Sequence, residues 1–465
     1  MRYSRPFTYG INTLAALVLA TAIVVAKEIP VENASAFAAA CANAKPGDTL
    51  VLRSGEWRDA TLLFNASGSA EAPITLSVAE PGKTKLTGRS RLTFAGAHLI
   101  ARGLVFSDGY VESGSVVQFG SDKKEAADCR LTESAIIAYN APDCTKRYNW
   151  VQLVGRGHRV DHCRFEGGNH FGITIQVVAG AGDNRHKIDH NYFLNRAPGG
   201  DNGYETIQIG QAKDAHRDSN SLVEYNLFES CDGEQEIVSN KTGGNVYRKN
   251  TFIRSAGALT LRHGDRATVE SNIFIGGGKL HTGGVRVIDR NHVVRGNYFH
   301  GLTGLPTAGA IIALYAGIPN SIPTGYVESE NAVIADNVLI DNAANGINLS
   351  AGHLSRNRTI LPRNVSLRDN WIDQHPLYGA TVLTGTPGEA LACSGNFYTA
   401  HSEIGYAPAS GFTQTPFKNP NPDLPFPMYD AMSPPDTREH DGWKTTMAAL
   451  ELLTPAKVGP SWWPR

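Results

Sequence analysis

Two glutamates near the middle of the chain are the first residues whose spacing could do chemistry. Glu234 and Glu236 stand at i and i+2 in the segment Cys231–Lys241, so on a strand their carboxylates share one face. Two unpaired carboxylates that faced a core would be prohibitively unfavourable, so this face must meet water or a cation. The pair alone is compatible with a solvated acidic patch, and its neighbours must decide between these two interpretations.

An asparagine recurs along the chain, once in each repeat of a short sequence phrase. Further polar residues lie at similar distances in residues after this asparagine. The candidates, each with its distance in residues from the repeated asparagine before it, are Asn202 (11), Glu234 (8), Glu236 (10), Lys241 (15), Arg262 (12) and Arg286 (14). If equal phase means stacking, Asn202, Glu236 and Arg262 form a column across three turns, with Lys241 and Arg286 beside it. A cluster of this kind is typical of a functional site, and its hard oxygen ligands suit Ca²⁺.

The repeated asparagine belongs to a short phrase: an apolar residue, two variable residues, Asn, one variable residue, and an aromatic or aliphatic residue. Seven copies are centred on Asn191, Asn226, Asn250, Asn272, Asn297, Asn337 and Asn370, and an eighth has Cys163 in the asparagine position. The steps between the seven asparagines are 35, 24, 22, 25, 40 and 33 residues. A basic period of 22 to 25 residues, with Gly-punctuated β-rich segments, predicts an all-β parallel β-helix. Asparagine suits the bends because it tolerates left-handed backbone, and we expect it to form a hydrogen-bonded ladder.

The solenoid is expected to occupy residues 27–400 as one elongated domain, in place of the several domains that 465 residues would suggest. Its ends need covers, because an exposed strand edge invites aggregation. The Ala-rich stretch Val31–Cys41 predicts a short N-terminal capping helix, and Asp48–Leu52 predicts the first strand. From residue 401 the phrase stops and Pro becomes dense. Because this segment, 401–465, also holds aromatic residues, we expect it to pack on the solenoid.

The first 26 residues have the character of a secretory signal peptide. Arg2 and Arg5 precede an apolar stretch, and Val24–Ala26 resembles a cleavage site. We therefore expect a secreted or periplasmic protein, with a membrane anchor as the alternative. The formal net charge of −1 provides no long-range field for nucleic acid or an anionic membrane, so a polyanion would need a local basic site. The six cysteines contain no CxxC pair, which argues against zinc, although a Cys129–Cys144 disulfide could form in an oxidising compartment.

The chain resembles polysaccharide lyase family 6 in four segments: Asp201–Gly210, Cys231–Lys241, Arg262–Gly264 and Gly283–Arg286. That family contains alginate lyases and the dermatan-cleaving chondroitinase B, on a right-handed parallel β-helix. The resemblance implies these roles: Asn202, Glu234 and Glu236 as Ca²⁺ ligands, Lys241 as Brønsted base, Arg262 as Brønsted acid, and His263 and Arg286 as substrate contacts. Gln208 is a further substrate contact, at a position where many members have Arg.

The implied reaction is a β-elimination on a uronic acid linked through O-4. A base removes the hydrogen on C-5, the O-4 group leaves, and an unsaturated uronate forms. Because C-5 lies beside an ionised carboxylate, its hydrogen is poorly acidic until a cation such as Ca²⁺ neutralises that carboxylate. Lys241 can act as a base only while its amine is neutral, which nearby positive charge favours. Arg262 can donate the proton, or it can stabilise the departing oxygen while water donates the proton.

Alginate is the expected substrate, and dermatan sulfate (chondroitin B) is the alternative. A glycoside hydrolase would need two carboxylates that flank the scissile bond, whereas Glu234 and Glu236 occur with an amide, a lysine and an arginine. A non-catalytic carbohydrate-binding β-helix is a third possibility, but it would have no use for this set of residues.

Residues upstream and downstream of the cluster are candidates for the walls of a sugar cleft. They are Asn169 and His170, one or two turns before the cluster, and Tyr315 after it. The expected partner is an anionic polysaccharide. We expect no nucleic acid, no membrane contact beyond secretion, and a monomer.

Overall fold

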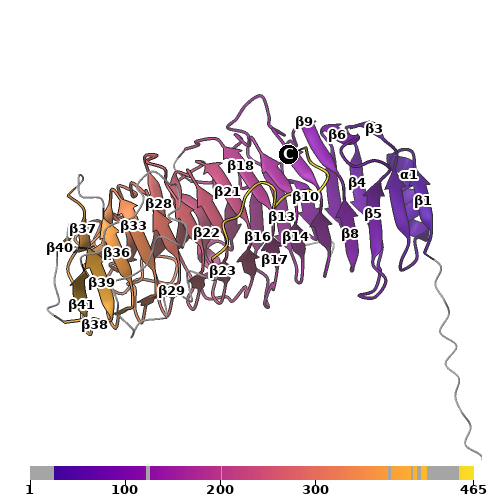
Figure 1. Cartoon of the computed structure of the whole chain (residues 1–465). Helices are drawn as coiled ribbons and strands as arrows, with labels where there is room; N and C mark the ends of the chain where they lie inside the picture. Colours follow the sequence, from indigo (N-terminus) through magenta and orange to yellow (C-terminus); the bar gives the residue numbers. More distant parts are fainter. Residues whose placement is uncertain are drawn as a thin grey trace, which may run out of the picture.

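The computed structural model describes residues 26–121, 126–200, 202–374, 379–399, 402–405, 410–415 and 450–464. Within these ranges the chain winds as a right-handed parallel β-helix, and most turns add one strand to each of three sheets (Figure 1). All strand pairs between consecutive turns are parallel, which places successive turns about 4.8 Å apart. Apart from Ala26, the predicted signal peptide lies outside the described residues, as does the proline-rich stretch 416–449. No helix of the described part is long and apolar enough to cross a membrane.

The three sheets run the length of the coil, and within each sheet every described strand pairs with the next one along the coil. Sheet A has 14 strands: β1 (Glu28–Val31), β2 (Thr49–Leu52), β5 (Ile74–Val78), β8 (Leu99–Arg102), β11 (Arg130–Thr132), β14 (Arg159–Asp161), β17 (Lys187–Asp189), β20 (Leu222–Glu224), β23 (Val246–Arg248), β26 (Thr268–Glu270), β29 (Val293–Arg295), β32 (Val333–Ala335), β35 (Ser366–Arg368) and β38 (Ala392–Ser394). Sheet B also has 14: β3 (Gly55–Arg58), β6 (Thr84–Gly88), β9 (Val105–Gly109), β12 (Ala135–Ile137), β15 (Arg164–Glu166), β18 (Tyr192–Arg196), β21 (Leu227–Cys231), β24 (Thr251–Ile253), β27 (Ile273–Ile275), β30 (Tyr298–His300), β33 (Val338–Asn342), β36 (Trp371–Gln374), β39 (Asn396–Thr399) and β41 (Phe412–Thr415). Sheet C has 13: β4 (Thr61–Phe64), β7 (Arg91–Phe94), β10 (Ser115–Phe119), β13 (Asn149–Val154), β16 (Ile175–Val178), β19 (Ile207–Ile209), β22 (Glu236–Asn240), β25 (Gly257–Leu261), β28 (Thr282–Val287), β31 (Ala310–Tyr315), β34 (Asn345–Ala351), β37 (Thr381–Thr384) and β40 (Glu403–Gly405).

The predicted asparagine ladder lies in the bend between sheets A and B. Each Nδ2 donates to the Oδ1 of the asparagine on the next turn at 2.9–3.0 Å, from Asn191 to Asn396. Asn396 extends the ladder by one turn beyond the copies found in the sequence. We expected the asparagine to be the left-handed residue of the bend. The left-handed residue is instead the one before it, for example Lys249 with φ 54°. The asparagine is selected instead because its amide satisfies buried backbone groups of neighbouring turns.

The aromatic members of the phrase form a column inside the coil. Six buried phenylalanines stack with ring centroids 4.5–5.2 Å apart and interplanar angles of 2–16°; they are Phe165, Phe193, Phe228, Phe252, Phe274 and Phe299. Leu339 and Ile372 continue the column on later turns. Because every turn places an apolar residue at this position, one continuous core holds the turns together.

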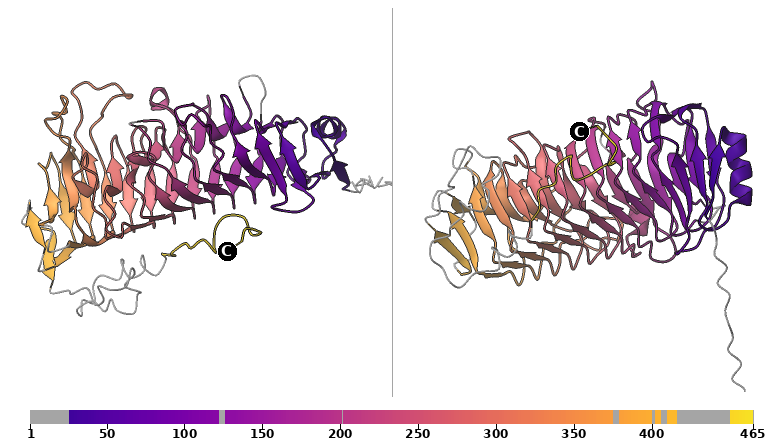
Figure 2. Two further views of the ribbon diagram at one scale, coloured as in Figure 1. Left: turned by 90° about the horizontal axis from the view of Figure 1, so that it is seen from above. Right: turned by 45° about the vertical axis from the view of Figure 1, so that its right-hand side comes forward.

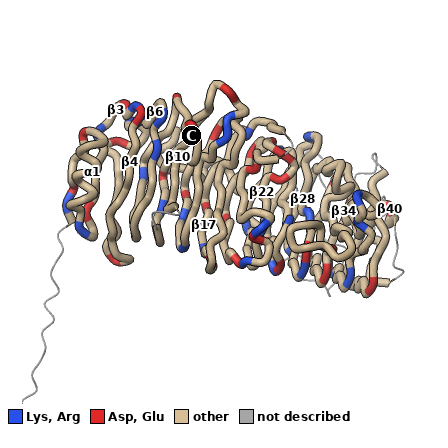
Figure 3. Tube along the Cα trace, turned by 180° about the vertical axis from the view of Figure 1, so that it is seen from behind, with Lys and Arg blue, Asp and Glu red and all other residues tan. Residues whose placement is uncertain are grey.

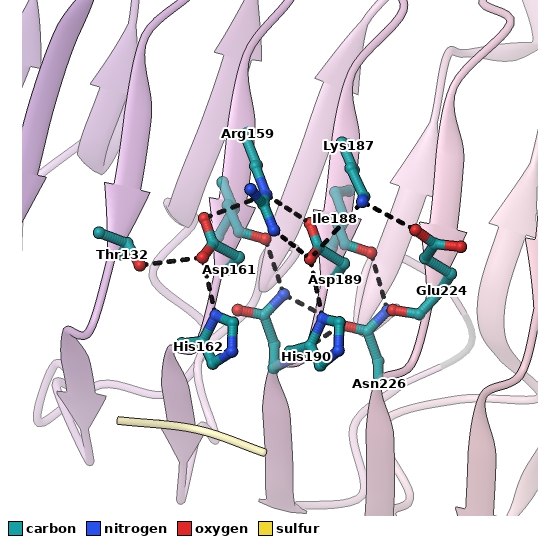
Figure 4. Close-up of polar contacts among 12 residues, drawn as sticks. Thr132, Arg159, Asp161, His162, Lys187, Ile188, Asp189, His190, Glu224 and Asn226 are labelled. Carbon is teal, nitrogen blue, oxygen red and sulfur yellow. Dashed lines mark hydrogen bonds and ion pairs between the residues drawn. The ribbon is translucent and has the colours of Figure 1, made fainter. Parts of the chain in front are cut away.

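On the outer face of sheet A the side chains form a ladder of alternating charge (Figure 4). Asp161, Asp189 and Glu224 occupy the same register position on consecutive turns. Arg159 donates to Asp189 at 2.6 Å, and Lys187 lies 2.8 Å from Glu224, so each cation bridges two turns. These contacts hold the charges of adjacent turns in pairs and keep this face soluble.

Both ends of the coil differ in detail from the sequence prediction. The capping helix α1 spans Ala34–Asn43, with Asn33 as its N-cap, and an additional strand β1 precedes it. At the other end the coil continues past the predicted boundary at residue 400 to Thr415, because β40 and β41 add to the sheets without the asparagine phrase. All six cysteines are free thiols, so the Cys129–Cys144 disulfide is not formed.

The C-terminal segment 450–464 lies along the outside of sheet B (Figures 1 and 2). Leu453 packs against Tyr192 and Leu227, and Gly459 donates to the carbonyl of His190 at 2.9 Å. Figure 2 shows this segment on the side of the coil opposite the long loops of the C-terminal half. The outer face of sheet C is therefore left to those loops and to the candidate site.

Candidate active site

The candidate site lies on consecutive turns of sheet C. Lys241 directly follows β22 and Arg262 directly follows β25, and the last residues of these strands, Asn240 and Leu261, are register partners. Lys241 and Arg262 thus occupy equivalent positions on adjacent turns. The column predicted from Asn202, Glu236 and Arg262 is wrong, because insertions of unequal length separate each ladder asparagine from its sheet C strand. The register column is instead Gln208, Ser239, Thr260 and Arg286.

Lys241 lies beside the buried carboxylate of Glu205, which was not among the residues predicted for the site. Its side chain is 12% exposed, and its Nζ donates to Oε1 of Glu205 at 3.3 Å. Glu205 itself is 1% exposed and lies just before β19, on the preceding turn. It is part of the segment Asp201–Gly210, and its proximity to Asn202 in the sequence was the only signal that could have identified it.

Glu205 and Glu234 form a carboxylate pair with unsatisfied oxygens. Oε2 of Glu205 and Oε1 of Glu234 are both buried without a hydrogen-bond partner. Burial, then the charges of Glu205 and Glu236, raise the pKa of Glu234 well above its usual range. Two buried carboxylates that repel one another in this way fit a bound cation, and oxygen donors are the ligands that Ca²⁺ prefers. In the described part, however, no group of three or more His, Cys, Asp and Glu side chains is arranged to hold a metal ion.

The carboxylate of Glu236 is bonded to other side chains. Its Oε1 accepts from Nη1 of Arg286 at 3.0 Å, and its Oε2 accepts from the hydroxyl of Ser239. Arg286 is 2% exposed, and its Nε donates to the hydroxyl of Tyr315 at 3.1 Å. Glu236, Arg286 and Tyr315 therefore form a buried polar chain behind the site, and in this structure Arg286 is satisfied by protein groups.

Arg262 and His263 lie together at the end of β25. Burial lowers the pKa of the Arg262 guanidinium. No carboxylate of the described part forms an ion pair with this side chain. Its Nη1 donates to the carbonyl of Gly325 at 3.0 Å and lies 3.4 Å from Nδ1 of His263. Burial, with the charges of Arg262 and Lys241, lowers the pKa of His263 to about 3, so its imidazole is neutral. His263 is 3% exposed, so its ring is shielded from solvent where it meets Arg262.

The other predicted residues are distributed differently. Asn202 is exposed in the loop before Glu205, and Asn169 is exposed in a turn. His170 is fully buried between the rings of Tyr148 and Trp150, so it belongs to the core and does not line a cleft.

Two predicted substrate contacts are engaged with other protein groups. Gln208 is 7% exposed, and its Oε1 accepts from Nε2 of Gln176 at 3.1 Å. Tyr315 is also buried, but it lines a cavity of about 740 Å³ beside the site. Arg286, Tyr326 and Arg358 share the lining of that cavity, as does Gln235, which lies between the two glutamates in the sequence. The cavity is thus rich in cationic and aromatic groups, which suits an anionic sugar.

Comparison with known families identifies the class of protein to which this parallel β-helix belongs. The family model described as Chondroitinase B matches residues 31–375. The chain therefore belongs to the chondroitinase B family, polysaccharide lyase family 6. No curated protein matched.

Solved structures agree with this assignment. The "PL6 family alginate lyase AlyGC" is 36% identical to this chain, with a TM-score of 0.85 over 94% of this chain and 59% of that one. A "mannuronic acid specific polysaccharide family 6 lyase enzyme from human gut microbiota" is 28% identical, with a TM-score of 0.70 over 84% and 91% of the two chains. The PL6 lyase Pedsa3628 from Pseudopedobacter saltans is 25% identical, with a TM-score of 0.74 over 94% and 100%. The chain thus spans about 59% of the length of AlyGC.

Proposed function

We propose that this protein is a polysaccharide lyase that cleaves a uronate-containing polysaccharide, alginate in the first place, by β-elimination. The observation that carries the proposal is the position of Lys241 and Arg262 on adjacent turns, beside the carboxylate pair Glu205 and Glu234. One relative named as an alginate lyase and another named as a mannuronic acid specific lyase support the choice of substrate. The signal-like residues 1–26 support a secreted or periplasmic location.

In the proposed reaction, the neutral amine of Lys241 takes the C-5 proton of the uronate. The electron pair of the C5–H bond forms a C4=C5 double bond, and the C4–O4 bond breaks with its electrons on O-4. Arg262, on the next turn, protonates or stabilises that oxygen, and its lowered pKa makes proton donation easier. Glu205 then stabilises the ammonium group that Lys241 has become.

Calcium is the expected cofactor of this reaction. The open oxygens of Glu205 and Glu234 would hold it, with Asn202 as a further donor expected from the sequence. Glu236, the other ligand expected from the sequence, would first have to exchange its bonds to Arg286 and Ser239. The ion would neutralise the substrate carboxylate and so make the C-5 hydrogen acidic.

The test is a substrate panel that is read by ultraviolet absorbance, because elimination creates a conjugated unsaturated uronate. Polymannuronate, polyguluronate, mixed alginate and dermatan sulfate are compared, the last because the matching family model is described as Chondroitinase B. We expect absorbance to rise on alginate. Lys241→Ala should abolish the rise, whereas Lys85→Ala, at an exposed position on β6, should not. New reducing ends without absorbance would indicate a hydrolase, and binding with neither product would indicate a carbohydrate-binding protein.

A further inference from the structure

Arg262 is positioned by a segment that joins the coil more than two turns later. Besides His263, its side chain contacts the carbonyl of Gly325 and the ring of Tyr326, whose centroid lies 3.9 Å from the guanidinium carbon. Both residues belong to the loop between β31 and β32, which returns along sheet C to reach β25. The catalytic arginine is therefore oriented by a distant insertion and not by its own strand.

Two cations contact the ring of Tyr326. The guanidinium carbon of Arg262 is 3.9 Å from the ring centroid, and that of Arg358 is 4.2 Å from it. Arg358 is 7% exposed, and its Nε is buried without a partner. No carboxylate of the described residues forms an ion pair with either arginine. The ring quadrupole attracts both guanidiniums.

The contacts of Arg262 with a ring and a carbonyl, in place of a carboxylate, determine how much of its charge is available. A carboxylate would fix the guanidinium equally well, but it would also neutralise its charge and raise its pKa. A tyrosine ring and a backbone carbonyl fix the direction of the side chain and leave its charge available. Such an arginine can stabilise negative charge that develops on a departing oxygen.

The loop that carries Tyr326 is itself anchored. The amide of Ile318 donates to the carbonyl of Tyr326 at 2.9 Å, which closes the loop on itself. Gly317 and Ile360 exchange two backbone hydrogen bonds, of 2.7 and 3.0 Å, and so tie this loop to the one that carries Arg358. Two loops from later turns are thus joined above sheet C, and together they bring Tyr326 and Arg358 to Arg262.

We propose that Tyr326 is a positioning residue that aims the guanidinium of Arg262 at the leaving oxygen. This inference rests on the proposed function. If it holds, loss of the ring face should impair departure of the leaving group and should affect substrate binding less, because a small displacement of a catalytic group can lower a rate by about 100-fold.

The test compares Tyr326→Leu, which keeps apolar bulk but removes the ring, with Tyr326→Phe, which keeps the ring. On alginate we expect Tyr326→Leu to lower kcat by about 100-fold with KM changed less than about threefold, and Tyr326→Phe to retain most of the rate. Tyr110→Leu is the matched control, because the ring of Tyr110 also lies 3.9 Å from a guanidinium, that of Arg89, but far from the site. Thermal denaturation of each variant shows that it is folded.

A second substrate separates positioning from a merely structural role. A uronate with an aryl ether at O-4 has a leaving group that needs no help from Arg262, so Tyr326→Leu should cleave it at nearly the wild-type rate. Equal losses on both substrates, or an unchanged kcat on alginate, would overturn the inference. If the wild-type protein forms no unsaturated uronate from any polysaccharide, the proposed function fails instead, and that result is distinct from either of the others.

Discussion

At the scale of single residues, Glu205 links the proposed base to the proposed cation site. One oxygen accepts from Lys241 and the other is buried without a partner, as is one oxygen of Glu234, whose pKa the charge of Glu205 raises. An isolated pair of buried carboxylates is unfavourable, because each raises the free energy of the other's ionised form. Such a pair needs compensation, either by a proton on Glu234, whose pKa is raised by burial and by its neighbours, or by a bound cation that displaces that proton.

Calcium is therefore expected to stabilise the protein, and Glu205→Gln should remove most of that effect. A ligand that binds only the folded state at 100 times its Kd stabilises it by about 2.7 kcal/mol. The measurement is the thermal midpoint with added calcium and with excess chelator. Glu71→Gln, on an exposed loop, is the control and should respond to calcium like the wild type. If Glu205→Gln kept the full calcium-dependent shift, Glu205 would not be a ligand.

At the scale of elements, the bends of the coil depend on the asparagine ladder. The side chain of Asn250 donates to Asn272 and to the carbonyl of Val223, and it accepts from the backbone amide and the side chain of Asn226. Asn250→Ala leaves several of these buried groups without partners, so we expect the free energy of unfolding to fall by about 3 kcal/mol. Urea denaturation measures the loss. Asn65→Ala, at an exposed position outside the ladder, should change it by less than about 0.5 kcal/mol, and a similar loss in both variants would argue against the ladder as a source of stability.

Histidines inside the coil make its stability sensitive to acid. Burial lowers the pKa of His158 and of His292 to about 4, and it lowers the pKa of His186 well below its usual range. The folded state thus holds these rings neutral, whereas the unfolded chain protonates them near pH 6.5. Their contribution is complete above pH 6.5 and is lost as the pH falls towards 4. We expect the urea midpoint to decrease between pH 7 and pH 5, and a flat profile over that range would contradict this assignment.

The elements were more predictable from the sequence than the contacts between them. The asparagine phrase repeats locally, so the ladder, the phenylalanine column and the sheet order follow from it. Asn169 and His170 show the limit: adjacent residues face opposite sides of an extended chain, and one of the two lies in the core. Glu205 and Tyr326 could not be placed, because each meets its partner only through turns and loops of unequal length.

At the scale of the whole molecule, charge is balanced overall and concentrated locally. Acidic and basic residues alternate along the coil, and both occur around β22 (Figure 3). With a formal net charge of −1, the protein as a whole does not attract a polyanion. Arg262 and Arg358, which have no acidic partner within the described part, can therefore supply local attraction without making the rest of the surface basic.

The C-terminal segment gives the outer face of sheet B a cover that the coil itself lacks. Outward-facing apolar residues such as Val338 and Ile340 lie in a cluster that Leu450 and Leu452 contact. Further along, Ser461 donates to the carboxylate of Glu133. The segment thus crosses many turns and ties them together side by side. A parallel sheet that is apolar on both faces needs such a cover.

Deletion of residues 450–465 should therefore expose an apolar strip and promote self-association. Exposed apolar patches of this kind favour contact between molecules, so we expect a larger mass by light scattering and a lower thermal midpoint than for the full chain. Lys457→Ala is the control, because Lys457 belongs to the same segment but is largely exposed and pairs only within it, with Glu451 and the carbonyl of Leu452. A truncated protein with the mass and midpoint of the full chain would show that the coil needs no cover. Because sheet C lies on another side of the coil, truncation should affect stability and association before it affects the rate of cleavage on folded protein.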